Sequence, residues 1–351
     1  MSVPLSTTKW PVAVGLGVAG SLIVALVVLA FLWPAKTTTP QHLPVSVSGP
    51  ASAVTALGDA VAAQSPDAFE FVEASDRADA VAQIEARESY GAFILGEGAT
   101  PPEVLTAPAA SAAATQILNG VAAQLQAQLS QQVVAAGGDA AAATITVTPV
   151  VSLSDTDPSG SGLAAASFPL MMGGMVGGIL ISLLVVGASR RLIALAAFGV
   201  SVGVVLAFML QTWFGFLQGD FMINTVAIGL SILATSSFIV GCTALLGSRG
   251  VPLGALVTMF VGSPLASAAT PWQFLPEPWG AIGQFFVPGA SNWLMRSLSY
   301  FPEANVTPQW LILTGWTVLG LVLILIGHLR ARAAAVPVNL GLEPERELVT
   351  A

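Results

Sequence analysis

Leu163–Ser189 reads LAAASFPLMMGGMVGGILISLLVVGAS and contains no Asp, Glu, Lys or Arg. The hydrocarbon core of a bilayer is about 30 Å thick, and roughly 20 apolar residues cross it as an α-helix. Lipid offers no hydrogen-bond partners to a backbone, so a membrane-spanning segment must be a helix or part of a closed barrel. Because this stretch is long and lacks the alternation of a strand, we expect a transmembrane helix.

Five other stretches share this length and this lack of charge, and only one of them precedes Leu163. They are Pro11–Trp33, Leu192–Phe216, Phe221–Gly247, Val251–Ala269 and Gln309–Gly327. The sequence therefore predicts a polytopic α-helical membrane protein with six transmembrane helices, one (residues 11–33) followed by five within residues 164–328. We expect the first stretch to be a retained anchor, because its apolar run is longer than that of a signal peptide.

The composition agrees with a membrane protein. Apolar residues make up 54% of the 351 residues and charged residues only 9%, whereas a soluble domain carries about 25% charged residues. The single cysteine, Cys242, excludes an internal disulfide framework and a cysteine-rich metal site. The two histidines, His42 and His328, are far apart in sequence. We therefore expect no metal, no cofactor and no histidine-based catalysis.

Basic residues near the ends of the apolar stretches predict the orientation in the membrane. With the N-terminus inside, the inner side receives Lys9, Arg190, Arg191, Arg249, Arg330 and Arg332. The outer side receives Lys36 beside the first stretch and Arg296 in the middle of a loop. We therefore expect a multi-pass protein of the plasma membrane, with residues 1–10 and 329–351 in the cytoplasm and residues 35–163 outside it.

The insertion at residues 35–163 has the pattern of a small folded domain. Strand-like runs are expected at His42–Ser48, Phe69–Val72, Tyr90–Leu95 and Thr144–Val151, and helical spacing at Ala51–Gln64, at 110–135 and after a cap at Ser75. Strands that alternate with helices predict an extracytoplasmic α/β domain with a small parallel or mixed sheet. The domain holds 13 acidic and three basic residues, so nucleic acid is not an expected partner.

Short motifs do not indicate an enzyme. The GxGxxG match at Gly15–Gly20 and the GxSxG match at Gly199–Gly203 both lie inside expected membrane helices, where neither motif can work. No GxxxxGK[ST] sequence is present, so this chain has no P-loop for ATP. Glycines four residues apart, as in Gly174/Gly178 and Gly199/Gly203, predict close helix packing or a dimer contact.

The loop after the fifth stretch reads TPWQFLPEPWGAIGQFFVPGASNWLMRSLSYF at residues 270–301. Its prolines forbid one continuous helix across the membrane, and its aromatic residues suit the membrane–water boundary. We expect a re-entrant or interfacial segment at 271–301 with a short outer-leaflet helix at about Trp279–Tyr300. The candidate outer gate or lipid contact consists of Trp272, Trp279, Trp293 and Arg296. The alternative is a lid that only packs against the helices.

Three features together resemble a known family. LPVSVSGP follows the first stretch, an α/β insertion precedes five clustered stretches, and VGSPLASAATPWQFLPEPWGAIGQFFVPGASNWLMRSLSYF follows at 261–301. The chain resembles the type 2 ABC exporter permeases, specifically the actinobacterial members related to the phage-infection-protein family. This resemblance implies a dimeric membrane subunit that exports an amphipathic or lipid-like compound with a separate cytoplasmic ATP-binding subunit.

The inner turns give the candidate contact with that subunit, namely Arg190, Arg191 and Arg249. Such permeases usually carry coupling helices before the first span and between the second and third spans. Here about ten residues precede the first stretch and Ser189–Arg191 forms a tight turn, so we expect a small coupling surface. The alternative is a non-transporting receptor or scaffold that presents its outer domain.

Overall fold

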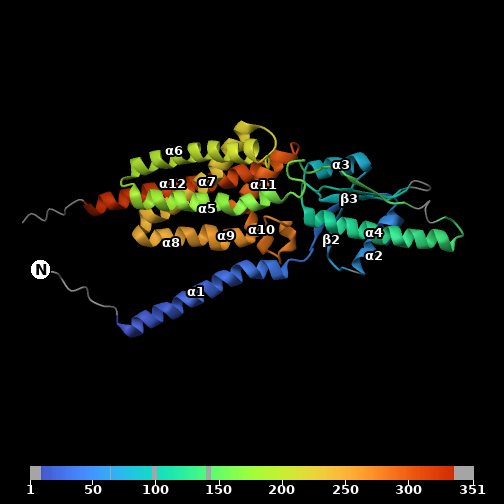
Figure 1. Cartoon of the computed structure of the whole chain (residues 1–351), viewed down its shortest axis with the longest axis horizontal. Coiled ribbons are helices and arrows are strands. Elements are labelled where there is room, and N and C mark those ends of the chain that lie inside the picture. The colour runs from blue at the N-terminus through green and yellow to red at the C-terminus, as the bar shows by residue number, and fades with distance from the viewer. Residues whose placement is uncertain (1–8, 64, 97–100, 140–143, 336–351) are drawn as a thin grey trace, which may run out of the picture.

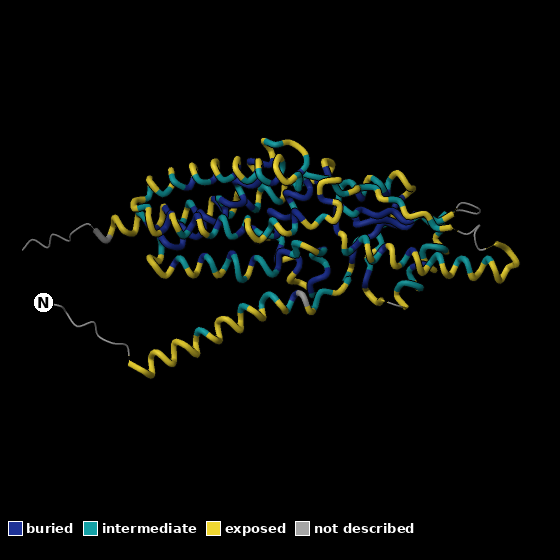
Figure 2. The backbone as a smooth tube through the Cα atoms, viewed as in Figure 1, coloured by how far each residue is buried: buried dark blue, intermediate teal, exposed yellow. Residues whose placement is uncertain are grey.

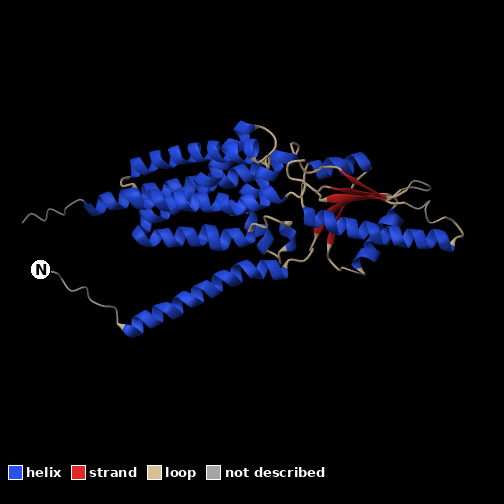
Figure 3. Cartoon of the chain, in the orientation of Figure 1, coloured by secondary structure: helices blue, strands red, loops and turns tan. Residues whose placement is uncertain are grey.

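The structure is a computed structural model that describes residues 9–63, 65–96, 101–139 and 144–335. Most of the two ends predicted to be cytoplasmic, residues 1–8 and 336–351, lie outside the described residues. A helical bundle forms one part of the molecule and an α/β domain lies at one end of it (Figure 1). All strands belong to that end (Figure 3).

Long helices form the bundle and its neighbour α1. They are α1 (Trp10–Thr37), α5 (Ser161–Leu184), α6 (Ala188–Ala207) with its π-helical extension η2 (Phe208–Trp213), α7 (Phe221–Leu246) and α12 (Thr307–Ala335). Within the described ranges, five helical runs are long and apolar enough to cross a membrane. The prediction of an α-helical membrane protein is thereby confirmed.

One of these runs, Phe221–Leu265, is longer than a single crossing requires. It contains α7, a turn η3 (Gly247–Arg249), and then α8 (Gly250–Ala255), η4 (Leu256–Val261) and α9 (Gly262–Leu265). Gly250 lies against Cys242, and a Cβ added at Gly254 would lie 2.9 Å from the Cα of Ile239. The run is therefore a helical hairpin whose second arm returns antiparallel along α7.

Helix α7 is the centre of the bundle, and glycines bring its neighbours close. A Cβ at Gly203 of α6 would lie 2.7 Å from the carbonyl oxygen of Thr225, and one at Gly174 of α5 would lie 2.8 Å from Thr235. Helices α5 and α6 thus meet α7 at glycines, as the spacing predicts. In contrast, α1 and the outward face of α6 are exposed (Figure 2).

The α/β domain contains a mixed five-stranded sheet with the order β2-β1-β3-β4-β5. Its strands are β1 (Leu43–Ser48), β2 (Phe69–Glu73), β3 (Gly91–Ile94), β4 (Glu103–Thr106) and β5 (Thr146–Pro149), and its helices are α2 (Ala51–Ala62), α3 (Arg77–Glu85) and α4 (Ala112–Ala135). Only the β3–β4 pair is antiparallel. Helix α3 lies on one face of the sheet and α2 and α4 lie on the other (Figure 1).

Two local predictions in this domain are wrong. Strand β4 is not expected from the sequence, because it is short and one of its two partners, β5, lies far along the chain beyond α4. Ser75 does not cap α3. The carboxylate of Asp76 accepts the backbone N–H of Asp79 at 2.8 Å, while the Asp79 carboxylate accepts the N–H of Ser75.

The segment predicted to be one helix at Trp279–Tyr300 consists of two. After the turn η5 (Trp272–Phe274), α10 spans Trp279–Gln284 and α11 spans Val287–Tyr300. Pro288 explains the new start, because proline suits a first helical turn but interrupts the middle of a helix. Helix α11 packs Ala290 and Leu294 into the bundle.

We predict that Gly203→Ala destabilises the bundle by about 1–3 kcal/mol, because the added methyl group collides with the backbone of α7. Gly315→Ala is the matched control in α12, since a Cβ there meets nothing within 4 Å. The melting temperatures of both variants in a neutral detergent provide the measurement. Equal melting temperatures would contradict the close approach of α6 and α7.

Candidate functional site

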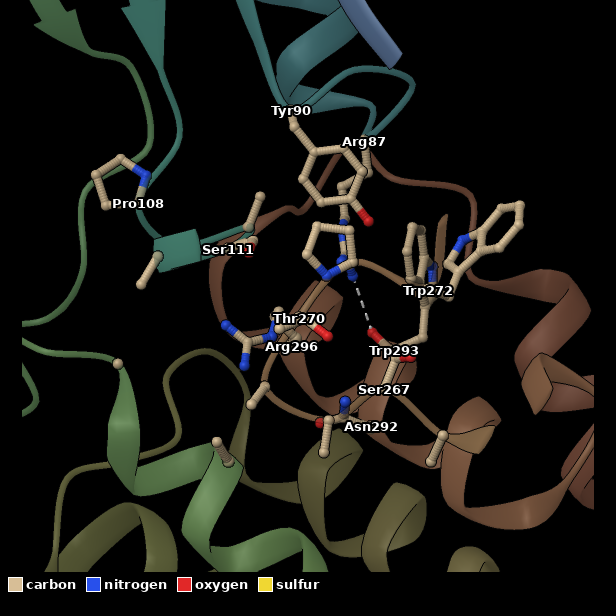
Figure 4. A pocket seen from close by; sticks show the side chains of 18 of the residues that line it. Arg87, Tyr90, Pro108, Ser111, Ser267, Thr270, Trp272, Asn292, Trp293 and Arg296 are labelled. Atoms are coloured by element: carbon tan, nitrogen blue, oxygen red, sulfur yellow. Dashed lines mark hydrogen bonds between the residues drawn. The ribbon is translucent and has the colours of Figure 1, made fainter. Parts of the chain in front are cut away.

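A cavity of about 240 Å³ lies between the α/β domain and the bundle, and we call it the junction cavity. Arg87 and Tyr90 extend into it from the α/β domain, toward Trp293 and Arg296 of α11 (Figure 4). Ser111, the N-cap residue of α4, also lines the cavity. Residues far apart in the sequence thus meet at this one site.

Arg87 reaches the cavity from an unfavourable backbone conformation. It follows the end of α3 with φ of 61°, a left-handed position that glycine usually occupies. Its Nη1 donates hydrogen bonds to the Trp293 carbonyl at 3.2 Å and to Ser297 Oγ at 2.8 Å. Its guanidinium carbon lies 3.5 Å from the centroid of the Trp293 ring. These contacts offset a backbone strain of about 1–2 kcal/mol.

Burial strongly affects the ionisable groups from the α/β domain. Desolvation lowers the pKa of Arg87 to about 9, and the positive charge of Arg296 acts in the same direction. Arg87 therefore remains charged at neutral pH. Desolvation raises the pKa of Tyr90, whose hydroxyl donates to Gln273 Oε1 at 3.3 Å, so the phenol stays neutral.

Arg296 is the second cation of the junction cavity and is only 8% exposed. Its Nη1 donates to the carbonyl oxygen of Ala109 at 3.0 Å, which is its one hydrogen bond within the described residues. The nearby carboxylate of Asp157 accepts the backbone N–H groups of Ser161 and Gly162 at the start of α5. Neither Arg87 nor Arg296 forms an ion pair in the part of the chain that the structure describes.

Two uncharged side chains at the cavity also lack partners. Ser267 Oγ and Gln284 Nε2 are buried and have no hydrogen-bond partner among the described residues. Buried polar atoms are nearly always hydrogen-bonded, so each such atom requires an explanation.

The lining of the junction cavity suits an anion rather than a cation. Among the residues that the structure describes, the lining contains two arginines and no Asp or Glu. Across the described ranges, no three His, Cys, Asp or Glu side chains lie close enough together to hold a metal ion. The chemistry that this arrangement supports is therefore the binding of negatively charged oxygen atoms.

A second cavity of about 110 Å³, the inner cavity, lies deeper in the bundle. Ala164, Ala266, Ala268 and Asn292 line both cavities, so the two adjoin. The inner cavity is mostly apolar, with Phe168, Met171, Ile232 and Met295 in its wall, and it also exposes hydroxyl groups such as that of Ser231. The two cavities together offer a charged compartment next to an apolar one.

The structure brings together three of the four residues of the predicted outer gate. Trp272, Trp293 and Arg296 line the junction cavity, whereas Trp279 does not. Trp279 is 44% exposed and meets Trp33 of α1 edge to face, with ring centroids 6.3 Å apart. Much of α11 is buried between helices, so this part of the segment is not a helix lying flat on a lipid surface.

The residues of the predicted ATPase contact lie at the opposite end of the bundle from the sheet, at the α5–α6 and α7–α8 turns (Figure 1). Arg190 and Arg249 are exposed there. Arg191 is partly buried and donates to the carbonyl oxygens of Val185 at 2.9 Å and Ser182 at 3.1 Å. Arg191 therefore stabilises the end of α5.

Sequence reasoning did not find Arg87, Ser267 or Gln284. The one available signal for Arg87 is that a strongly acidic segment contains few basic residues. Ser267 and Gln284 carry no such signal, because their importance arises from burial.

Comparisons with known proteins add nothing to these observations. No family model matches the chain, no curated protein matches it, and no solved structure matches it. The assignment of a function therefore depends on the sequence and on the geometry of the cavities.

We predict that Arg87→Gly destabilises the protein by about 2 kcal/mol, although it relieves the left-handed backbone, because the contacts with Trp293 and Ser297 are lost. Asp67→Gly is the matched control, since Asp67 also has φ of 61° but its side chain is exposed. Its stability should stay within about 0.5 kcal/mol of the parent protein. Residues 154–162 connect β5 of the α/β domain to the start of α5 in the bundle. The rate at which a protease cleaves this connection checks both variants. If Arg87→Gly resists the protease as well as the parent protein, Arg87 does not hold the junction.

Proposed function

We propose that the chain is the membrane permease subunit of an ABC-type exporter that moves an amphipathic or lipid-like compound outward. The observation that carries this proposal is the pair of adjoining cavities, one charged and one apolar. An amphiphile has the same two kinds of surface. The resemblance to type 2 exporter permeases points to the same function.

We propose a topology of six crossings in the plasma membrane, with both termini in the cytoplasm. The hairpin Phe221–Leu265 supplies two of the crossings, because its two arms run antiparallel. Arg190, Arg249 and Arg330 lie at the end of the bundle away from the sheet, which supports a cytoplasmic position for that end (Figure 1). The α/β domain is then extracytoplasmic.

The transported compound would leave past the junction cavity. Trp272 and Trp293 line this cavity, and the proposed gate consists of these two residues together with Arg296. Trp279 contributes differently, by contact with α1. Lipid or a second copy of the chain would cover the exposed apolar surface of α1, and we propose a homodimer.

The second candidate function is a receptor or scaffold that does not transport. A cavity of about 190 Å³ between α2 and α4 favours it, because Val61, Ile117, Val121 and Leu125 form an apolar lining there. An ATPase that co-purifies with the chain would favour export. A component of a secretion machine that co-purifies instead would favour the scaffold.

We predict that a cysteine at position 65 is accessible from outside the cell and that a cysteine at position 248 is not. Ser65→Cys and Ser248→Cys are introduced separately into a Cys242→Ala background, and both positions are exposed in the structure. A membrane-impermeant maleimide applied to intact cells should label only position 65. Permeabilised cells, in which both should react, are the control. Labelling of position 248 alone in intact cells would contradict the orientation.

We predict that the purified chain hydrolyses no ATP and that a separate ATP-binding subunit gains activity when combined with it. The chain has no P-loop, which is the reason for the first part. Arg190→Glu combined with Arg249→Glu should lower the stimulation about tenfold by reversing charge at the contact. Lys36→Glu, a reversal of an exposed charge in the last turn of α1, is the control. Full stimulation of the double variant would exclude these arginines from the contact.

A further inference from the structure

The junction cavity contains unused hydrogen-bond donors on two buried cations. A guanidinium group has five N–H donors. Only Nη1 of Arg87 and Nη1 of Arg296 donate to protein atoms within the described residues. The buried Asp157 carboxylate is the nearby negative charge for Arg296, but its oxygens accept the backbone N–H groups of Ser161 and Gly162. No carboxylate among the described residues lines the cavity itself, and burying two positive charges against so little negative charge is costly. An anion in the cavity would therefore stabilise both arginines.

Independent features at the same cavity favour an oxygen-rich anion. Ser267 and Gln284 line the cavity, and the Ser267 hydroxyl group and the Gln284 amide nitrogen have no hydrogen-bond partner among the described residues. The N-terminus of the long helix α4 also lies there, at Ser111 and Ala112. The positive end of a helix dipole favours a negative group. These donors come from the α/β domain and from the bundle.

The adjoining inner cavity adds an apolar compartment to the anion site. Met171, Met295 and Phe168 are among its lining residues, and it holds no charged side chain. Small or short side chains at positions 164, 266 and 268 separate the two cavities. A free anion would use only the first compartment, whereas an anionic group attached to an alkyl chain would use both.

We propose that the junction cavity binds the anionic oxygen headgroup of an amphiphile, with Arg87 and Arg296 as its ligands and the alkyl chain in the inner cavity. Arginine suits this role because its planar fork can contact two oxygens of a phosphate or carboxylate at once. That this ligand is the exported compound depends on the function proposed above, whereas the binding itself does not.

Native mass spectrometry of the full chain in a neutral detergent tests the proposal, with dodecyl phosphate as the probe. We expect one bound molecule per chain. Arg296→Gln should weaken binding about tenfold, because it removes the charge, and Arg296→Lys should restore part of it. Arg77→Gln removes a charge from the α/β domain that pairs with Glu103 and does not line the cavity, so this variant should bind like the parent protein.

Two further variants separate binding from folding. Ser267→Ala removes a hydroxyl group that has no hydrogen-bond partner in the described part of the chain, so stability should stay unchanged while binding weakens about threefold. Ser231→Leu fills the inner cavity and should weaken dodecyl phosphate more than ethyl phosphate. A melting temperature for each variant identifies any loss that is caused by unfolding.

Three results would overturn the proposal. Equal binding of dodecyl phosphate to Arg296→Gln and the parent protein would exclude the arginine site. Equal affinity for inorganic phosphate and dodecyl phosphate would show a free-anion site without a chain. If no probe binds the folded parent protein, the cavity is not a binding site for anionic amphiphiles. The binding assay contains no ATPase and therefore does not depend on export. A chain that binds dodecyl phosphate but exports nothing would count against the exporter function alone.

Discussion

The contact between Arg87 and α11 is the interaction on which the arrangement of the two parts depends. It joins the end of a short helix in the α/β domain to Trp293 and Ser297 on the other side of the junction. The left-handed backbone at Arg87 is locally unfavourable, and it places this guanidinium group at the junction. Around it, Phe274 and Phe301 extend the core of the sheet into the bundle segment, so the junction is packed as well as hydrogen-bonded.

Helices pack closely around α7 and less evenly near the α/β domain. The cavities lie between these two regions of the bundle. Toward α7, glycines and small hydroxyl residues let helix backbones meet directly, which leaves little free volume. Toward the α/β domain, Pro271, Pro276 and Pro278 prevent a continuous helix, and short helices cannot fill the space as evenly.

The sequence predicts the features that arise from local patterns. The apolar stretches, the alternation of strands with helices, and the glycine contacts are all encoded within a few turns of the chain. Strand β4 and the break before Val287 are missed, because the first is short and pairs with the distant strand β5, and the second depends on where a proline falls within a helix. Trp293 and Arg296 are identifiable from the aromatic composition of residues 270–301 and from the position of this segment after the fifth apolar stretch. Their partner Arg87 is not, because it is 206 residues away from Trp293.

Helix α11 belongs to two cores at once. Val287, Ala290 and Leu294 pack with α7 and α12, while Tyr300 and Phe301 at its far end pack with the sheet. A helix is stiff along its axis. If the inner half of α11 tilts, its outer end therefore moves with it. Arg296 lies between these two anchor points and Arg87 lies on the other part. Rocking of the bundle against the sheet that breaks the hydrogen bonds from Arg87 to Trp293 and Ser297 would therefore change the spacing of the two guanidinium groups, and with it the shape of what fits between them.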